Sequence, residues 1–145
     1  MWSYEVNHTF LKRLAHDADL LTAIREAFET QGIRMGFFQV IGAVKQAHIA
    51  FYDQKDRVYR GLNVQEAGEI LSCTGNVSEL DGALLVHAHI ILGLADGTTR
   101  GGHLVQGTRI FAGELFGMAL KGEQLRRAYD EVTGLKLWPS NPETP

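Results

Sequence analysis

The chain has 145 residues, of which 45% are hydrophobic and 21% charged, a composition typical of one globular domain with an adequate core. Its 14 Lys and Arg residues are outnumbered by 17 Asp and Glu residues, so the net charge is −3 and the pI about 6.0. This balance excludes a general attraction to nucleic acid. The single cysteine, Cys73, excludes an internal disulfide and suits a reducing compartment.

The N-terminal segment has no features of a secretory signal. Residues Met1 to Glu5 lack the basic and apolar regions that such a signal needs. No apolar run in the chain approaches the roughly 20 residues that span a bilayer. We therefore expect a cytoplasmic protein with no membrane association.

The first predicted elements are a strand and a helix. Residues Tyr4 to Leu14 alternate weakly in polarity and predict the strand. Asp17 or Asp19 can cap the helix that follows, and Gly32 is placed to end it. This helix would bury an apolar stripe formed by Leu20, Leu21, Ile24, Ala27 and Phe28.

Short apolar runs broken by turn residues follow, and they predict strands. These runs lie close together with no helical stretches between them, so antiparallel neighbours are favoured over parallel crossovers, which need about a dozen connecting residues. Glycines inside the predicted strands, such as Gly42, Gly113 and Gly117, indicate bulges or bends in the sheet. The prediction is an α+β fold, a curved and mainly antiparallel sheet with one main helix packed on it. The strands are expected at residues 37–44, 46–52, 58–62, 69–77, 83–94 and 108–120, with a short helix at 123–129.

Three histidines are the strongest candidates for chemistry. His87 and His89 are two residues apart in an apolar run, so both imidazoles leave the same face of a strand. His103 follows the turn signal Asp96-Gly97, where a hairpin would fold it back toward the other two. Three neutral imidazoles that converge on one point predict a divalent metal site, with zinc as the first choice.

The residue types also allow other interpretations. The paired histidines can simply pack between Leu85 and Ile91 on a half-buried strand. Glu69 and Glu114 fall in predicted strands, where each is either an acceptor for a ligating imidazole, a fourth ligand, or a carboxylate exposed on an edge strand. Cys73 either reaches the metal or is a small buried hydrophobe.

A series of short motifs runs along the chain: Gly68-x-Ile70-Leu71-Ser72, Gly75-Asn76-Val77, His87-x-His89, Asp96-Gly97, Gly101-Gly102-His103-Leu104 and Glu114. Together these motifs resemble the plant and prokaryote conserved domain, also called the PPC or DUF296 domain, in its prokaryotic single-domain form. The resemblance covers about Tyr4 to Thr133. It implies a compact α+β domain that forms a homotrimer, and a zinc ion held by His87, His89 and His103.

The resemblance also implies an association with DNA. Plant members of the family join this domain to AT-hook segments, which bind the DNA minor groove. The chain has no Arg-Gly-Arg-Pro core of that kind, and its densest basic pairs are Lys12-Arg13 and Arg126-Arg127. Binding to DNA is therefore an analogy at the level of the fold.

Three functions are compatible with these observations. The first is a zinc-binding, trimeric module with a regulatory role, whose partner is a protein or, indirectly, DNA. The second is a zinc-dependent hydrolase or lyase in which Glu69 or Glu114 serves as the base. The third is a protein that binds DNA directly. We expect one domain over residues 1–137 and a flexible C-terminal tail over 138–145, and the pattern assigns no catalytic residue.

Overall fold

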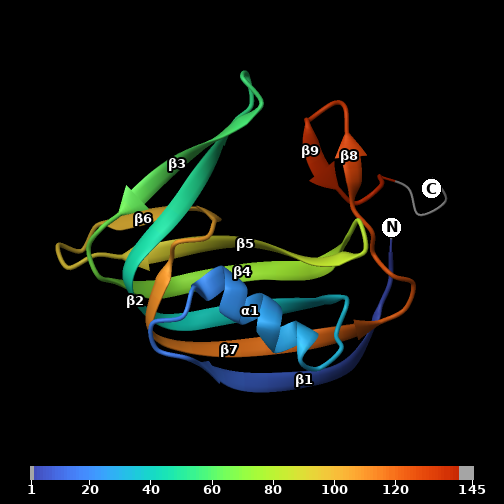
Figure 1. Cartoon of the computed structure of the whole chain (residues 1–145), viewed down its shortest axis with the longest axis horizontal. Helices are drawn as coiled ribbons and strands as arrows, with labels where there is room; N and C mark the ends of the chain where they lie inside the picture. Colours follow the sequence, from blue (N-terminus) through green and yellow to red (C-terminus); the bar gives the residue numbers. More distant parts are fainter. Residues whose placement is uncertain (1, 141–145) are drawn as a thin grey trace.

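A computed structural model describes residues 2–140 of the chain. It has the predicted α+β fold, in which one helix packs on a mainly antiparallel sheet (Figure 1). The elements are β1 (Glu5–Leu14), α1 (Leu20–Glu29), β2 (Gly36–Asp53), β3 (Val58–Val64), β4 (Gly68–Leu80), β5 (Ala83–Gly93), β6 (Thr99–Leu104), β7 (Arg109–Lys121), β8 (Ala128–Asp130) and β9 (Leu135–Leu137).

Helix α1 begins and ends where the sequence predicts. Asp19 is the N-cap, and its Oδ1 accepts a hydrogen bond from the backbone N–H of Thr22 at 2.9 Å. The other carboxylate oxygen of Asp19 accepts from the backbone N–H of Gly107 at 2.8 Å, which ties the start of the helix to the loop before β7. Gly32 follows the helix with a φ of 67°, the left-handed conformation that favours glycine.

Strand β2 is one long strand where the sequence predicts two shorter ones. Its first half pairs with β4 and β7, and its second half pairs with β3 and β6. The two halves meet at Gln46 and Ala47. Gly42, in the first half, has a φ of 138° and lies at a register shift in the pairing with β4, whereas the pairing with β7 shifts between Ala43 and Gln46. A β-bulge at this glycine bends the strand without ending it, because the hydrogen-bonded ladders continue on both sides.

The bend in β2 closes part of the sheet into a ring. The strands follow the order β1-β7-β2-β4-β5-β6, and β6 pairs both with β5 and with the far half of β2. The turn between β5 and β6 contains Gly97 with a φ of 81°, as the Asp96-Gly97 signal predicts. Because of this closure, the end of β6 lies between β5 and the second half of β2.

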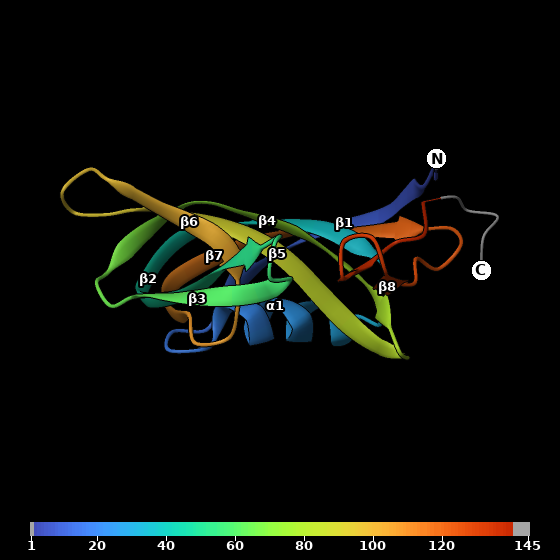
Figure 2. The same ribbon diagram turned by 90° about the horizontal axis from the view of Figure 1, so that it is seen from above.

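The two faces of the sheet differ in what covers them. Figure 2 shows α1 on one side of the sheet, where Phe28 and Ile24 pack with Phe38, Val40 and other fully buried side chains. On the opposite side, which we call the open face, large hydrophobic side chains remain exposed. They alternate along the strands with the core residues and include Leu11, Phe37, Ile41, Leu71 and Ile91.

The short helix predicted at 123–129 is not present, and this prediction was wrong. The segment instead enters a small hairpin of β8 and β9. The backbone N–H of Glu79 donates to Leu125, and that of Arg127 donates back to the carbonyl of Glu79, at 3.0 and 2.8 Å. These long-range bonds use the backbone groups that a helix would need, so tertiary pairing overrides the helical propensity.

Most of the predicted tail lies outside the described residues. Trp138, its first residue, is described, and its indole Nε1 donates to the hydroxyl of Ser78 at 3.1 Å. Residues 141–145 lie outside the described part of the chain. Across residues 2–140, no helix is long and apolar enough to cross a membrane.

Candidate metal centre

The structure brings the three predicted histidines together on the open face. His87 and His89 lie on β5, and His103 on β6 is in direct register with His89. The ring centroids are 5.3 Å apart for His87 and His89, 5.1 Å for His87 and His103, and 5.5 Å for His89 and His103. One ring nitrogen from each residue lies within 4.8 Å of the other two. Zinc–imidazole bonds are about 2.0–2.1 Å long, so two nitrogens that share one ion are at most about 4.2 Å apart, and the three rings would move closer together around an ion.

The surroundings of His87 and His103 favour the uncharged imidazole, the form that binds a metal. Burial lowers the pKa of His87 to about 4, and the charges of Arg127 and the other two histidines add to the effect. The pKa of His103 is also lowered, first by burial and then by His89 and Arg127. Metal ligation requires the neutral imidazole, and His87 is neutral at pH 7 with such a pKa.

One buried nitrogen in the cluster has no protein partner. Nδ1 of His103 is buried and makes no hydrogen bond with any described residue. A buried polar atom left without a partner costs free energy, and such atoms are uncommon in folded proteins. Together with the convergence of the rings, this orphaned nitrogen fits a site built for a bound metal.

The Gly75-Asn76-Val77 motif lies next to the histidine cluster, and the packing there explains its glycine. A Cβ atom on Gly75 would lie 2.1 Å from the backbone oxygen of His87 and 2.6 Å from the ring of Phe38. Glycine is therefore required for β4 to approach β5 at this point. Asn76 is in register with His87, and its Oδ1 accepts a hydrogen bond from Arg127 at 2.8 Å.

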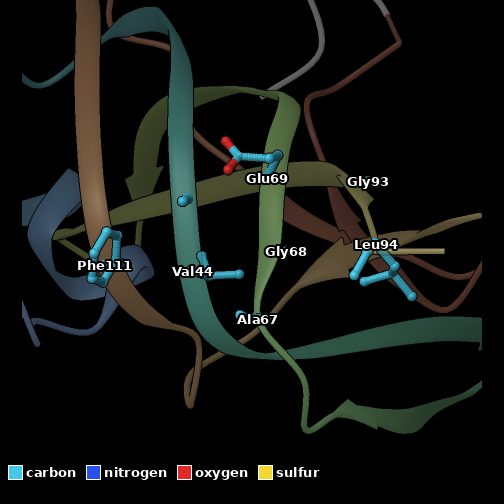
Figure 3. A pocket seen from close by; sticks show the side chains of 9 residues that line it. Val44, Ala67, Gly68, Glu69, Gly93, Leu94 and Phe111 are labelled. Atoms are coloured by element: carbon cyan, nitrogen blue, oxygen red, sulfur yellow. The ribbon is translucent and has the colours of Figure 1, made fainter. Parts of the chain in front are cut away.

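Glu69 does not lie with the histidines in this chain. It is in register with Gly93, four residues beyond His89, which is about 13 Å along the strand. Glu69 instead lines a separate pocket of about 360 Å³, whose other lining residues include Leu94 and Phe111 (Figure 3).

Glu114 and Cys73 also lie apart from the cluster. Glu114 is on β7, three strands away from β5, and a strand spacing is about 4.8 Å. Cys73 is fully buried on the helix side of the sheet, in register with Val40 and Ile90. The structure thus brings together the three predicted histidines, and neither of the carboxylates nor the thiol accompanies them.

A pocket of about 330 Å³ adjoins the histidines and contains residues that the sequence analysis missed. The ring of Tyr59 lies 4.8 Å from that of His103, tilted by 31°. The β8–β9 hairpin forms one wall and is held to the β2–β3 hairpin, where the Tyr52 hydroxyl donates to the carbonyl of Thr133 at 2.8 Å. Figure 1 shows the two hairpins on the same side of the sheet.

Arg127 is the most informative of the missed residues. Only 9% of it is exposed, and it lines the pocket together with His87 and His103. The sequence gives it no local signal, because it belongs to a pair, Arg126-Arg127, that looks like a solvated basic patch. Only Arg126 matches that description, with Nε 3.1 Å from the carboxylate of Glu79 at the surface.

A long sheet closed back on itself and one covering helix define an α+β domain, and the three clustered histidines give it a candidate metal site. The model of the Plants and Prokaryotes Conserved (PCC) domain matches residues 1–121, and the chain belongs to this family. None of the curated proteins compared with the chain matches it.

Solved structures show the same fold over nearly the whole chain. A metal-containing protein from Archaeoglobus fulgidus is 42% identical, with a TM-score of 0.91 over 97% of this chain and 99% of that one. A plant- and prokaryote-conserved (PPC) protein from Pyrococcus horikoshii is 33% identical, with a TM-score of 0.92 over 97% of both chains. A protein from Bacteroides thetaiotaomicron, provisionally described as DNA-binding, is 26% identical, with a TM-score of 0.84 over 96% of this chain and 97% of that one.

Proposed function

We propose that the protein binds one zinc ion per chain through His87, His89 and His103 and acts as a trimeric, non-enzymatic module with a regulatory role in the cytoplasm. The observation that carries the proposal is the convergence of three ring nitrogens within 4.8 Å. One of the rings, that of His103, also has a buried nitrogen without a hydrogen-bond partner among residues 2–140. The metal-containing relative from Archaeoglobus fulgidus supports it. Imidazole ligands suit zinc among the common divalent metals.

Elemental analysis of protein purified without a histidine tag tests the metal assignment. We expect about one zinc per chain in the wild type and almost none in the His87→Ala/His89→Ala double variant. The matched control is His8→Ala/His16→Ala, which removes two exposed histidines outside the cluster. Equal metal content in the two double variants would refute the assignment.

The trimer is supported by the open face of the sheet. Leu11 is 82% exposed there, Leu71 is 55% exposed, and Phe37, Ile41 and Ile91 are exposed beside them on neighbouring strands. Apolar patches of this kind are typical of surfaces that other protein subunits cover. We therefore assign this face to copies of the same chain, as the family resemblance implies.

A zinc-dependent hydrolase or lyase is the second candidate, and the pocket beside the histidines favours it. Three protein ligands leave one coordination position open, and zinc in such a site activates a bound water. Glu69 and Glu114 do not reach the cluster within the chain, so neither is positioned there as a base. The non-enzymatic function therefore ranks first.

Direct binding to duplex DNA is expected to be weak and independent of sequence. Affinity for DNA comes largely from Lys and Arg residues that neutralise phosphates. In this chain Arg127 is buried and Arg126 is paired with Glu79, which leaves Lys12-Arg13 as the exposed basic pair. Fluorescence anisotropy with random and AT-rich duplexes at about 150 mM salt measures this. A submicromolar, sequence-dependent Kd would place DNA binding first.

A further inference from the structure

Arg127 is a nearly buried cation with no acidic partner among residues 2–140. Its Nε donates to the hydroxyl of Ser78 at 2.9 Å, Nη1 to the backbone carbonyl of Lys136 at 2.9 Å, and Nη2 to the side-chain carbonyl of Asn76 at 2.8 Å. All three acceptors are neutral. Buried charges are normally paired with an opposite charge, because removing them from water is costly. The charge of Arg127 is left uncompensated by the described residues.

The guanidinium is held rigidly and still has donors to offer. Trp138 covers it at 5.0 Å from the ring centroid, and the indole of Trp138 is fixed in turn by Ser78. Arginine has five N–H groups, and three are used. One N–H on each of Nη1 and Nη2 therefore has no acceptor among the described residues. Each of these two N–H groups can donate to an oxygen of a carboxylate or phosphate group, the anions that arginine commonly binds.

The pocket that Arg127 lines has a uniformly positive charge pattern. Its charged lining residues are Arg57, Arg127 and Lys136, and it has no lining Asp or Glu among the described residues. Arg57 is fixed at the hairpin wall, where it donates to the backbone carbonyls of Glu131 and Val132, both at 3.1 Å. A concave site lined by one sign of charge concentrates ions of the opposite sign, even though the chain as a whole is acidic.

From this arrangement we infer that the pocket binds a small molecule carrying a carboxylate or phosphate group, which Arg127 holds beside the three histidines. The inference rests on the proposed zinc site, because a second oxygen of the ligand would then face the metal. Its own basis is the uncompensated charge of Arg127 and the acid-free pocket of about 330 Å³. That volume lies at the lower end of the range for small-molecule sites.

Isothermal titration of the zinc-loaded wild-type protein with malonate and with inorganic phosphate tests the inference. We expect at least one of the two anions to bind with a Kd below about 1 mM, a modest affinity for a small ligand. The anion that binds more tightly identifies the group. In Arg127→Gln the affinity should fall about 10-fold or more, the equivalent of one charge-assisted hydrogen bond.

The matched control is Arg126→Gln, which removes the same charge one residue away but outside the pocket. It should bind the anion as the wild type does. If Arg127→Gln fails to fold, Arg127→Lys carries the test, since it keeps the charge but loses the fork and should bind at least about 3-fold more weakly. No anion binding to the zinc-loaded wild type, or equal losses in the Arg126 and Arg127 variants, would overturn the inference.

Metal content measured on the same samples separates the two ideas. A wild type without zinc refutes the proposed function, and the anion titration of that protein still decides the role of Arg127. A zinc-loaded wild type that binds neither anion refutes only the inference about the pocket.

Discussion

The side of strand β4 on which Cys73 lies determines the reactivity of its thiol. Cys73 lies on β4 next to Thr74, which is in register with His89, but the alternation of the strand turns the thiol toward the core. There the thiol is fully buried, and burial raises its pKa to about 12. A thiol that stays protonated is a poor nucleophile and a poor metal ligand.

This burial predicts how Cys73 responds to pH and to thiol reagents. At pH 8 the native protein should not react with a disulfide reagent over an hour, whereas the unfolded chain should release one equivalent per chain, measured by absorbance. The pKa of the Cys73 thiol is higher in the folded protein than its value of 9.0 in the unfolded chain. The contribution of the buried, protonated thiol to the free energy of unfolding is therefore complete below pH 9 and is lost as the pH rises toward 12. Full labelling of native protein at pH 8, absent in Cys73→Ser, would contradict this account.

At the scale of elements, the bend in β2 decides whether the ring of strands can close. A Cβ atom on Gly42 would lie 2.2 Å from the backbone oxygen of Ala112, in addition to the strain of a φ of 138°. We expect Gly42→Ala to lower the free energy of unfolding by about 3 kcal/mol, measured by urea denaturation. Gly82→Ala is the control, because Gly82 also has a positive φ of 81° but open space around it.

The control should cost only about 1 kcal/mol, the strain of the left-handed backbone alone. Equal destabilisation by the two substitutions would mean that the contact between β2 and β7 is not close at Gly42. A larger effect at Gly42 than at Gly82 is the outcome that fits a bulge packed against its neighbouring strand.

Elements that depend on neighbouring residues could be predicted from the sequence, whereas elements that depend on long-range contacts could not. Local sequence patterns are sufficient to predict helix α1, the turn at Asp96-Gly97 and the placement of His87 and His89 on the same face of one strand. The β8–β9 hairpin depends on backbone bonds between Glu79 and residues far along the chain. The burial of Arg127 depends on the same hairpin, and no periodicity in the sequence encodes it.

In the whole molecule, the exposed apolar side chains of the open face indicate a subunit interface, which we assign to the proposed trimer. Light scattering coupled to size exclusion should give a mass three times the 16.1 kDa of the chain at micromolar concentration. Leu11→Glu, which places a charge on the open face, should shift this mass toward the monomer. Val132→Glu is the control, because Val132 is also 82% exposed but lies in the β8–β9 turn.

A wild type that is monomeric would remove the trimer from the proposed function. A trimer that Leu11→Glu leaves intact while Val132→Glu dissociates it would assign the interface to the β8–β9 hairpin. Neither result would affect the metal site, since all three histidines come from β5 and β6 of one chain.

The most direct measurement of the central claim is a crystal structure of the untagged protein with anomalous diffraction recorded on both sides of the zinc absorption edge. We expect one strong anomalous peak per chain, present only above the edge and bonded to His87, His89 and His103 at about 2.0–2.1 Å. We also expect the fourth coordination position of the metal to face the pocket lined by Arg127. A peak elsewhere, or three histidines without any metal in zinc-supplemented crystals, would contradict the assignment of a zinc site to these histidines.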